Sequence, residues 1–397
     1  MPAGISPDQM IRVPFILRMI TRIHAPGNTM SQYYGLGITP RGTTSQIIGN
    51  AGQYDIFDGT RSLSFFSAKG APANRLNRKQ IGSVPITVPR QYNSIGLEDD
   101  KMFGVRGLGQ PFAQPTAGFN KAYFTRQIQY AKQRMNNTHE FMTAHMFRGG
   151  WTVKPYGSVA GSPLLVPAEL GDADAIYTNS TQVPASHRDD LDAVLGGTQT
   201  PWDDPQANII QQLMALQVIA ARENGRRITD IWLNGNTAAH LFTNSVLQAV
   251  GGSVYKIFDT LNPSKEIGPN QEFPDTGCTV VFRGLPDYKF HIYNQGYVTP
   301  GTSESFSAQT SSANWNYFIP DDYAVFTPPP GDWCEMVQGS ESMQWNLLER
   351  QSQVIFGFGM GTERAIEPPR TDVKMLDNSA PVITEPYAVY YIKVMNY

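Results

Sequence analysis

The sequence predicts an α+β fold that combines an N-terminal arm, an extended β-hairpin loop, one long helix and a central mixed sheet. Three observations indicate this class. A helical pattern runs from about residue 120 to residue 147 without an interrupting Gly or Pro, enough for a helix about 40 Å long. Two β-forming segments precede it, and a βα step with several further β-forming segments follows it.

The chain is poor in charge for its length. Its 397 residues include 31 basic and 34 acidic side chains, for a net charge of −3, and only 16% of residues are charged, against about 25% in ordinary soluble domains. A hydrophobic fraction of 41% excludes a disordered polyelectrolyte, and no apolar run reaches the roughly 18 residues of a membrane span. We therefore expect a folded chain without membrane segments, part of whose surface is covered by another molecule.

Residues 1–53 are predicted to form the N-terminal arm. Residues 10–24 have the pattern of a short amphipathic helix, whereas the Gly-rich stretch from 25 to 53 has neither a helical nor an alternating period. That stretch still carries apolar side chains such as Tyr34 and Ile38, which disordered tails seldom do. We expect it to become ordered by lying on another subunit.

The extended hairpin loop follows, with predicted strands at Tyr54–Phe66 and Val84–Leu97. No acidic residue lies between Asp58 and Glu98, so this region is strongly basic. Its basic residues are Arg61, Lys69, Arg75, Arg78, Lys79 and Arg90.

An acidic segment over residues 169–204, with a net charge of −7, complements the hairpin. Complementary charged patches steer association and fix its register, so we expect the hairpin tip to dock on this segment of a neighbouring copy. Nucleic-acid binding by the hairpin is the alternative, which a pI near 6.1 disfavours. The residues predicted for the docking contact are Arg75, Arg78, Lys79, Asp189, Asp190 and Asp192.

The long helix, predicted from about Asn120 to Phe147, places apolar side chains three and four residues apart and ends at Gly149-Gly150. A second helix is predicted to begin at Asp204-Pro205, where Asp would cap the first turn, and to end at Asn224-Gly225. The next elements are a strand at Ile228–Leu233 and a helix from about Thr237 to Val250. The later strands are predicted at Cys278–Phe282, Tyr288–Tyr293, Tyr317–Phe326, Ser352–Phe358 and Tyr387–Val394, with an exposed loop at Thr302–Asn316.

Several strings resemble catalytic or metal-binding motifs, and none fits. His139 and His145 are six residues apart on the long helix, about 240° around its axis, so both cannot bind one metal ion. Adjacent acidic pairs such as Asp321-Asp322 are typical of turns and caps, although carboxylates from distant segments could still meet. Cys278 and Cys334 have neither metal nor disulfide spacing, which predicts free thiols. The sequence thus predicts no enzyme, no metal site and no cofactor.

Four strings, in this order along the chain, carry a resemblance to a known family. They are Phe124–Phe147 followed by Arg148-Gly149-Gly150-Trp151-Thr152, then Trp202-Asp203-Asp204-Pro205, Phe318–Val325, and Ser379–Val382 with Glu385–Ala388. Together with the arm and the hairpin they resemble the major capsid proteins of tailed bacteriophages, in particular the lambda-type head protein family with the Hong Kong 97 capsid fold. The stretch from about Gly157 to Ser186 departs from that family and looks like an insertion.

The resemblance implies a domain order. It is an N-terminal arm at 1–53, a hairpin loop and connector at 54–118, a peripheral domain with the spine helix and insertion-like stretch at 119–200, an axial α/β domain at 201–370, and a C-terminal strand returning to the sheet at 371–397.

The resemblance also implies a function. The chain would assemble with copies of itself, as hexamers and pentamers, into an icosahedral shell that encloses double-stranded DNA without reading its sequence. It would be part of the virion capsid, assembled in the host cytoplasm, with portal, scaffold or decoration proteins as further partners. The alternatives are an encapsulin-like compartment shell and, from a different class, a monomeric β-rich hydrolase or carbohydrate-binding protein suggested by the many aromatic residues.

Overall fold

The structure, a computed structural model, confirms the α+β class and forms two compact units, each discontinuous in sequence. The first unit comprises Met1–Gly52, Thr87–Glu140 and Met336–Pro381, and the second comprises Gln53–Ile86, Phe141–Glu335 and Val382–Tyr397. Neither unit coincides with one of the predicted domain ranges, because strands far apart in sequence pair with one another. The residues that the structure describes are 29–57, 81–98, 117–156, 164–251, 255–267, 277–298, 315–346, 351–365 and 370–395.

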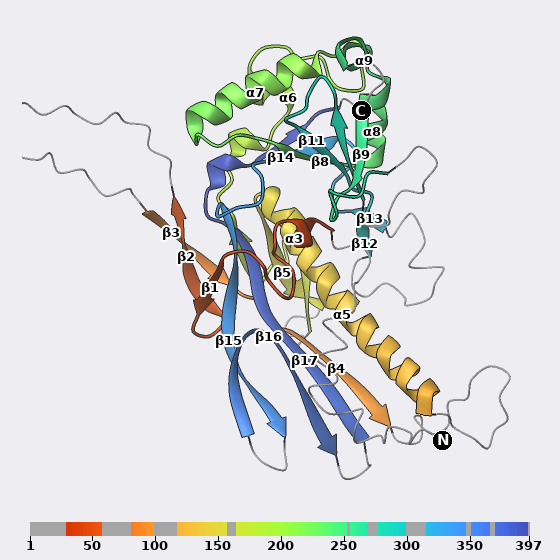
Figure 1. The fold of residues 1–397 in the computed structure, drawn as a ribbon. Coiled ribbons are helices and arrows are strands. Elements are labelled where there is room, and N and C mark those ends of the chain that lie inside the picture. The colour runs from red at the N-terminus through yellow and green to blue at the C-terminus, as the bar shows by residue number, and fades with distance from the viewer. Residues whose placement is uncertain are drawn as a thin grey trace, which may run out of the picture. The chain divides into compact units, whose positions relative to one another are not determined.

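A five-stranded sheet is the centre of the first unit (Figure 1). Its order is β1 (Thr44–Ile47), β15 (Cys334–Asn346), β16 (Gln351–Ala365), β17 (Arg370–Ile383) and β4 (Gln91–Glu98). Neighbouring strands are antiparallel except for β1, which runs parallel to β15 with Thr44 opposite Met336 and Ile47 opposite Gly339. The first strand of the sheet is therefore paired with a segment almost 300 residues further along the chain.

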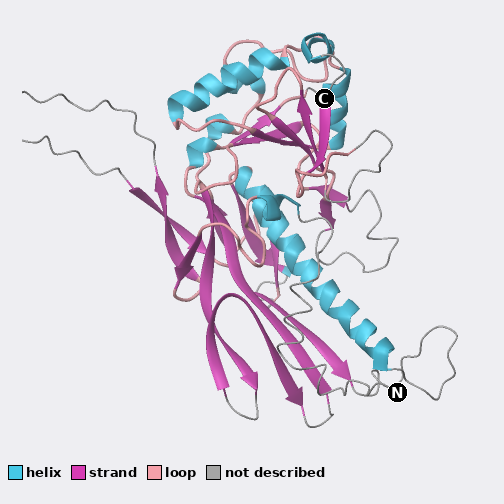
Figure 2. Cartoon of the chain, viewed as in Figure 1, coloured by secondary structure: helices cyan, strands magenta, loops and turns pink. Residues whose placement is uncertain are grey.

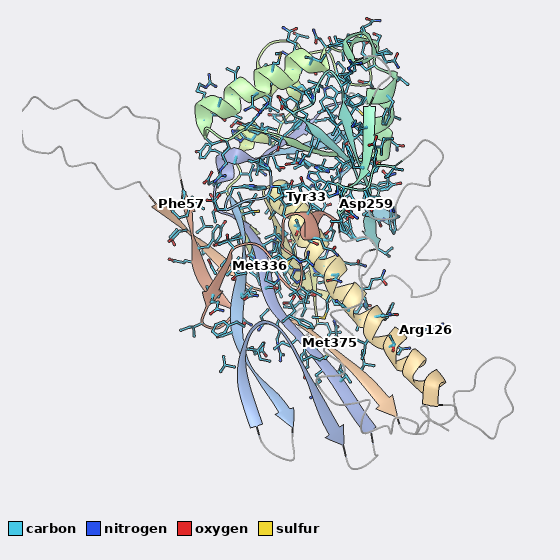
Figure 3. All side chains as sticks on the ribbon, viewed as in Figure 1. Tyr33, Phe57, Arg126, Asp259, Met336 and Met375 are labelled. Atoms are coloured by element: carbon cyan, nitrogen blue, oxygen red, sulfur yellow. The ribbon has the colours of Figure 1, made fainter. Side chains whose placement is uncertain are left out.

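The long helix is α5 (Ala117–Phe147), close to its predicted bounds. The predicted stripe is confirmed at Ile128, Ala131 and Met135, which are buried against the sheet, whereas Thr138 is only half-buried. Met375 of β17, labelled in Figure 3, belongs to the same cluster. The remaining buried members are Ile38, Met360 and Val373.

The segment that follows residue 28 differs from the predicted arm, which was expected to become ordered on another subunit. It forms a short helix, α3 (Thr29–Tyr33), and an irregular stretch that packs in the first unit. The side chains of Met30, Tyr34 and Leu36 are buried there by other residues of the same chain, which removes their apolar surface from water. The predicted helix at 10–24 lies outside the described residues.

The second unit is built on a six-stranded sheet, in the order β18, β14, β8, β11, β10 and β9. Their bounds are Tyr390–Lys393, Tyr323–Thr327, Asp230–Leu233, Lys289–Ile292, Cys278–Phe282 and Tyr255–Asp259. Ile231, Leu233 and Phe290 lie on one face and join a core with the helices, whereas Trp232 stacks on His291 on the other face. Both faces are therefore buried (Figure 2). The helices of this core are α6 (Leu191–Leu195), α7 (Ile209–Glu223), α8 (Gly235–Thr243) and α9 (Ser245–Gly251).

Two helix predictions for this unit were wrong in detail. The helix α7 begins at Ile209, not at Asp204-Pro205, because the side chain of Asn208 accepts the hydrogen bond of the Gln211 amide and is the cap. The predicted helix at 237–250 is divided at Asn244, whose buried side chain accepts from the Leu247 amide and donates to a distant carbonyl.

Much of the insertion-like stretch forms a three-stranded sheet with the strand that leaves α5. The order is β6 (Leu165–Glu169), β5 (Gly150–Pro155) and β7 (Tyr177–Ser180). Gly150 has φ +134°, and a Cβ atom there would lie 2.1 Å from the carbonyl oxygen of Asn179. Only glycine fits this tight exit from the helix.

The predicted hairpin is divided in the structure. The strands β2 (Ala51–Phe57) and β3 (Ile81–Thr87) pair as a two-stranded sheet, but β4 pairs with β17, so the predicted strand Val84–Leu97 is in fact two strands. Further short elements are β12 (Gly296–Val298), β13 (Trp315–Tyr317) and the 3₁₀ helices η2 (Ala185–His187) and η3 (Pro386–Ala388).

Candidate functional site

The acidic residues predicted for docking lie at the start of α6, where all three are exposed. Asp190 accepts the Ala193 amide at 2.8 Å, and Asp192 accepts the Gln199 amide at 2.6 Å. Asp189 accepts the amide of the next residue at 2.9 Å. We call these three residues the acidic loop. Among the described residues no Lys or Arg pairs with them, so their charges face solvent from a fixed backbone.

The basic residues Arg75, Arg78 and Lys79 lie outside the described residues, so the predicted contact with the acidic loop stays a prediction. Arg90, which the sequence grouped with them, has a different place. Its guanidinium pairs with Glu341 at 2.6 Å and lies 4.5 Å from the ring centre of Tyr92, all within the first unit. Arg90 therefore does not contribute free charge to the hairpin.

The strands that lead to the basic segment have a fixed base in the second unit. Tyr54 of β2 is buried, and its hydroxyl donates to the carbonyl of Ser180 at 3.4 Å. Burial, together with the nearby Glu335 carboxylate, raises the pKa of Tyr54, so the phenol stays protonated as a donor. The amide of Phe57 donates to the carbonyl of Thr384 at 2.8 Å.

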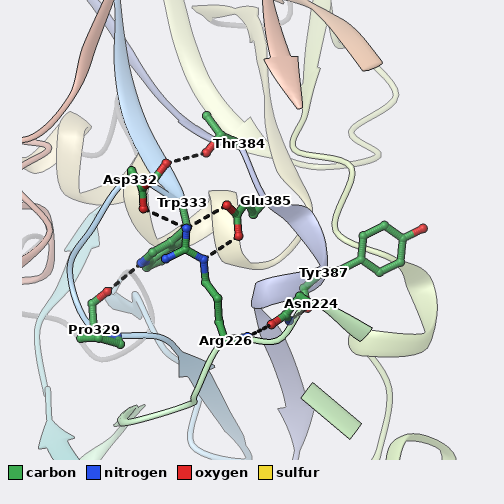
Figure 4. Close-up of polar contacts among 8 residues, drawn as sticks. All are labelled: Asn224, Arg226, Pro329, Asp332, Trp333, Thr384, Glu385 and Tyr387. Atoms are coloured by element: carbon green, nitrogen blue, oxygen red, sulfur yellow. Dashed lines mark hydrogen bonds and ion pairs between the residues drawn. The ribbon is translucent and has the colours of Figure 1, made fainter. Parts of the chain in front are cut away.

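A cluster of polar contacts around Arg226 fixes the segment Thr384-Glu385, whose Thr384 carbonyl accepts the Phe57 amide (Figure 4). Arg226 donates to both carboxylate oxygens of Glu385, at 2.5 and 2.8 Å, and to Asp332 at 2.8 Å. The Thr384 hydroxyl donates to the carbonyl of Asp332. Because a bidentate guanidinium–carboxylate pair fixes orientation as well as distance, the base of β2 rests on a rigid support.

Two members of the acidic segment are neutralised within the chain. Glu169 lies 3.6 Å from the His145 ring nitrogen and 3.2 Å from Arg148, and Lys154 pairs with Asp172 at 2.7 Å. The His145 contact and the Arg148 charge lower the pKa of Glu169 to about 2 against the opposing effect of burial. Within the described residues, the acids of this segment without a cationic partner are Asp174, the acidic loop and the Asp203-Asp204 turn.

The two histidines of the long helix serve separate carboxylates, as their angular separation requires. His139 contacts Asp377 in the first unit, and His145 lies beside Glu169 in the second. Across the described ranges no group of three His, Cys, Asp or Glu side chains could hold a metal ion. Cys278 and Cys334 are free and buried, as predicted.

Exposed apolar side chains are a feature that the sequence analysis missed. Met214 and Val218, one turn apart on α7, are 63% and 67% exposed. Apolar residues off the buried stripe of the same helix were the available signal. A second group lies at one end of the three-stranded sheet. It consists of Tyr156, Leu164, Leu165 and Ile176. Both groups are candidates for contacts with other molecules.

Comparison with known proteins gives matches in structure but not in sequence. No protein-family model matches the chain, and no curated protein matches it. A phage-related protein from Bordetella bronchiseptica matches 96% of this chain and 97% of its own, with 10% identity and a TM-score of 0.48. The mature capsid of bacteriophage PhiM1 matches 90% of this chain and 87% of its own, with 11% identity and a TM-score of 0.42.

The chain is similar in structure to phage capsid proteins. A further match, to a protein of Mycobacterium phage Bobi, covers 100% of both chains, with 10% identity and a TM-score of 0.42. All three TM-scores are below 0.5, so these matches alone do not assign a function. None of the helices in the described part of the chain is long and apolar enough to cross a membrane.

Proposed function

We propose that this chain is the major capsid protein of a tailed bacteriophage and assembles with copies of itself into an icosahedral shell around double-stranded DNA. The observation that carries the proposal is the acidic loop, which presents three exposed carboxylates without a cationic partner among the described residues. The same chain carries a basic segment between Asp58 and β3, residues 59–80, in which no residue is acidic. Opposite charges on different parts of one chain favour contact between copies.

Such a contact joins two different surfaces, so it is head-to-tail. Head-to-tail contacts close into rings when the rotation between copies permits, which is the geometry of hexamers and pentamers. The exposed apolar residues of α7 and of the three-stranded sheet would then be covered by neighbours. In this proposal portal, scaffold or decoration proteins are further partners, the shell assembles in the host cytoplasm, and the protein acts as structure and not as an enzyme.

Charge neutralisation of the acidic loop tests the proposal. Asp189→Asn, Asp190→Asn and Asp192→Asn, combined, keep the carbonyl oxygens that accept the local amides but remove three charges. We expect a folded chain whose yield of closed particles, counted by electron microscopy, falls at least about tenfold. The matched control combines Asp55→Asn, Glu266→Gln and Asp287→Asn, which also removes three exposed charges but lies outside the acidic segment 169–204.

A charge swap then identifies the partner surface. Arg75→Glu, Arg78→Glu and Lys79→Glu should abolish particles, and adding Asp189→Lys and Asp192→Lys should restore part of the yield. Normal particle yields from the neutralised loop would contradict the docking contact. Nuclease-protected double-stranded DNA in particles from lysates supports the viral shell, whereas protein cargo without DNA would indicate a compartment shell.

A further inference from the structure

A polar recess of about 230 Å³ lies in the second unit, where the end of α5 meets the six-stranded sheet. It is lined by His145, Arg148, Gly150, Glu169, Leu170, Arg188, Tyr323 and Tyr391. The volume would accommodate several water molecules, each of which needs about 30 Å³, or one small polyatomic ligand. The lining is polar and carries two guanidinium groups, which distinguishes the recess from a packing defect.

Two hydrogen-bonding groups of this lining are buried and have no partner within the described residues: the Tyr391 hydroxyl and Nε of Arg188. Tyr391 is only 6% exposed, and its ring stacks on Tyr323 with centres 4.6 Å apart. Because an unpaired buried polar group destabilises a fold, such groups are usually matched by a bound water, ion or ligand. Both groups can donate, so the partner they require is an acceptor.

The charges in the recess do not balance. Arg148 is paired with Glu169, and burial lowers the pKa of His145, which keeps that ring neutral. Arg188 donates from Nη1 to the carbonyl of Arg148 at 3.1 Å, and no carboxylate pairs with it among the described residues. One positive charge therefore remains, held beside the two unpaired groups.

We propose that this recess is a binding site for one oxyanion, a carboxylate or a phosphate group, held by Arg188 and Tyr391. The oxyanion supplies the acceptors that the Nε group and the hydroxyl lack, and its charge balances Arg188. The ligand comes from one of two sources: a free anion in solution, or an acidic side chain of a neighbouring copy. Binding of a free anion requires nothing of the proposed shell, whereas a side chain of a neighbouring copy can fill the recess only if the proposed self-assembly occurs.

Calorimetric titration with inorganic phosphate tests the site, against sodium chloride of equal ionic strength. We expect wild-type protein to bind phosphate, and Arg188→Gln to bind it at least about tenfold more weakly. Tyr391→Phe should also weaken binding while leaving every described hydrogen bond of the chain intact. The matched control is Arg227→Gln, which removes a guanidinium that pairs with Asp287 and does not line the recess.

Thermal unfolding of the same variants distinguishes the two sources. If a neighbour fills the recess, phosphate has no effect on wild-type particles, but Arg188→Gln and Tyr391→Phe both lower the particle Tm and Arg227→Gln does not. The direction of the Tm change for Tyr391→Phe is informative, because deleting a hydroxyl that binds nothing leaves the stability unchanged or raises it. The proposal is overturned if phosphate affects all variants alike, or if it has no effect and Tyr391→Phe is neutral or stabilising.

Discussion

Two adjacent side chains of α5 hold the segment that follows residue 28. Both oxygens of the buried Glu140 carboxylate are used, accepting the amides of Met30 at 2.8 Å and Ser31 at 2.9 Å. His139, also buried, contacts Asp377 of β17 and the carbonyl of Leu36. Charge-assisted hydrogen bonds from α5 thereby fix the segment that follows residue 28, which contains only one short helix of its own.

Glu140→Gln should release this segment locally. Glutamine offers one acceptor where two amides need one each, so a buried N–H loses its partner at a cost of about 1–3 kcal/mol. The free energy of unfolding in urea measures the loss, and faster hydrogen exchange at Met30 and Ser31 locates it. Glu266→Gln, on an exposed side chain, should stay within about 0.5 kcal/mol of wild type. Unchanged exchange at both amides would contradict the contact.

Asp377→Asn should change how stability depends on pH. Burial lowers the pKa of His139, but the Asp377 carboxylate outweighs it, so the pKa is raised above 6.5. A raised histidine pKa contributes stability that is complete below pH 6.5 and is lost as pH rises through the folded value. The difference in Tm between wild type and Asp377→Asn should therefore shrink from pH 6 towards pH 9. A difference that is constant over this range would contradict a charged pair.

At the scale of elements, the sequence predicted the helices whose apolar residues repeat at helical spacing without interruption. The helix α5 was found because its stripe repeats over the whole span, and α7 was found from Leu213 and Leu216 on one face. Helix ends were missed because several residues near each end can cap. Asp204 binds the Gln206 amide in a turn, while Asn208, further on, caps the helix.

Asn208→Ala should therefore cost more than Asp204→Ala. Loss of a side-chain cap costs about 0.5–2 kcal/mol, whereas the Asp204 contact lies in an exposed turn and should cost less than about 0.5 kcal/mol. Urea unfolding of the two variants measures both effects. Equal or reversed losses would place the first turn of the helix earlier than the structure does.

The strand β15 was not predicted, and β17 was expected only as part of the C-terminal strand that the resemblance implied over residues 371–397. The end of β17 carries the buried Asp377, Asn378 and Ser379 in place of the apolar alternation that predicts a strand. Ser379 donates to Asp377 within the strand, and Asp377 contacts His139 of α5. A pattern search along one strand cannot find residues whose burial depends on a helix more than 200 residues away.

At the scale of the whole molecule, sequence charge predicted the kind of surface and not its position. The sequence predicted an acidic segment at 169–204 from its net charge of −7, but Glu169 and Asp172 have cationic partners in the fold. The acidic loop, like Asp204, keeps exposed carboxylates that accept local amides. The total charge of a segment follows from its composition. Which of its carboxylates form ion pairs depends on how the strands are arranged, which composition does not give.

Light scattering should separate the proposed shell from the monomeric alternatives. We expect particles in the megadalton range and not a species of 44.0 kDa. Their yield should fall when salt is raised during assembly, because the Debye length shrinks from about 10 Å at 0.1 M to about 3 Å at 1 M. A stable 44.0 kDa species at all salt concentrations would exclude self-assembly.

The parallel pairing of β1 with β15 also has a consequence during translation. The partner of Thr44 is Met336, so the ribosome must add almost 300 residues before the two can meet. At roughly 5–20 residues per second, the nascent β1 waits about 15–60 s. Throughout that time β1 has no native partner strand, so it is a target for chaperones, and the five-stranded sheet cannot be completed before Met336 has been synthesised.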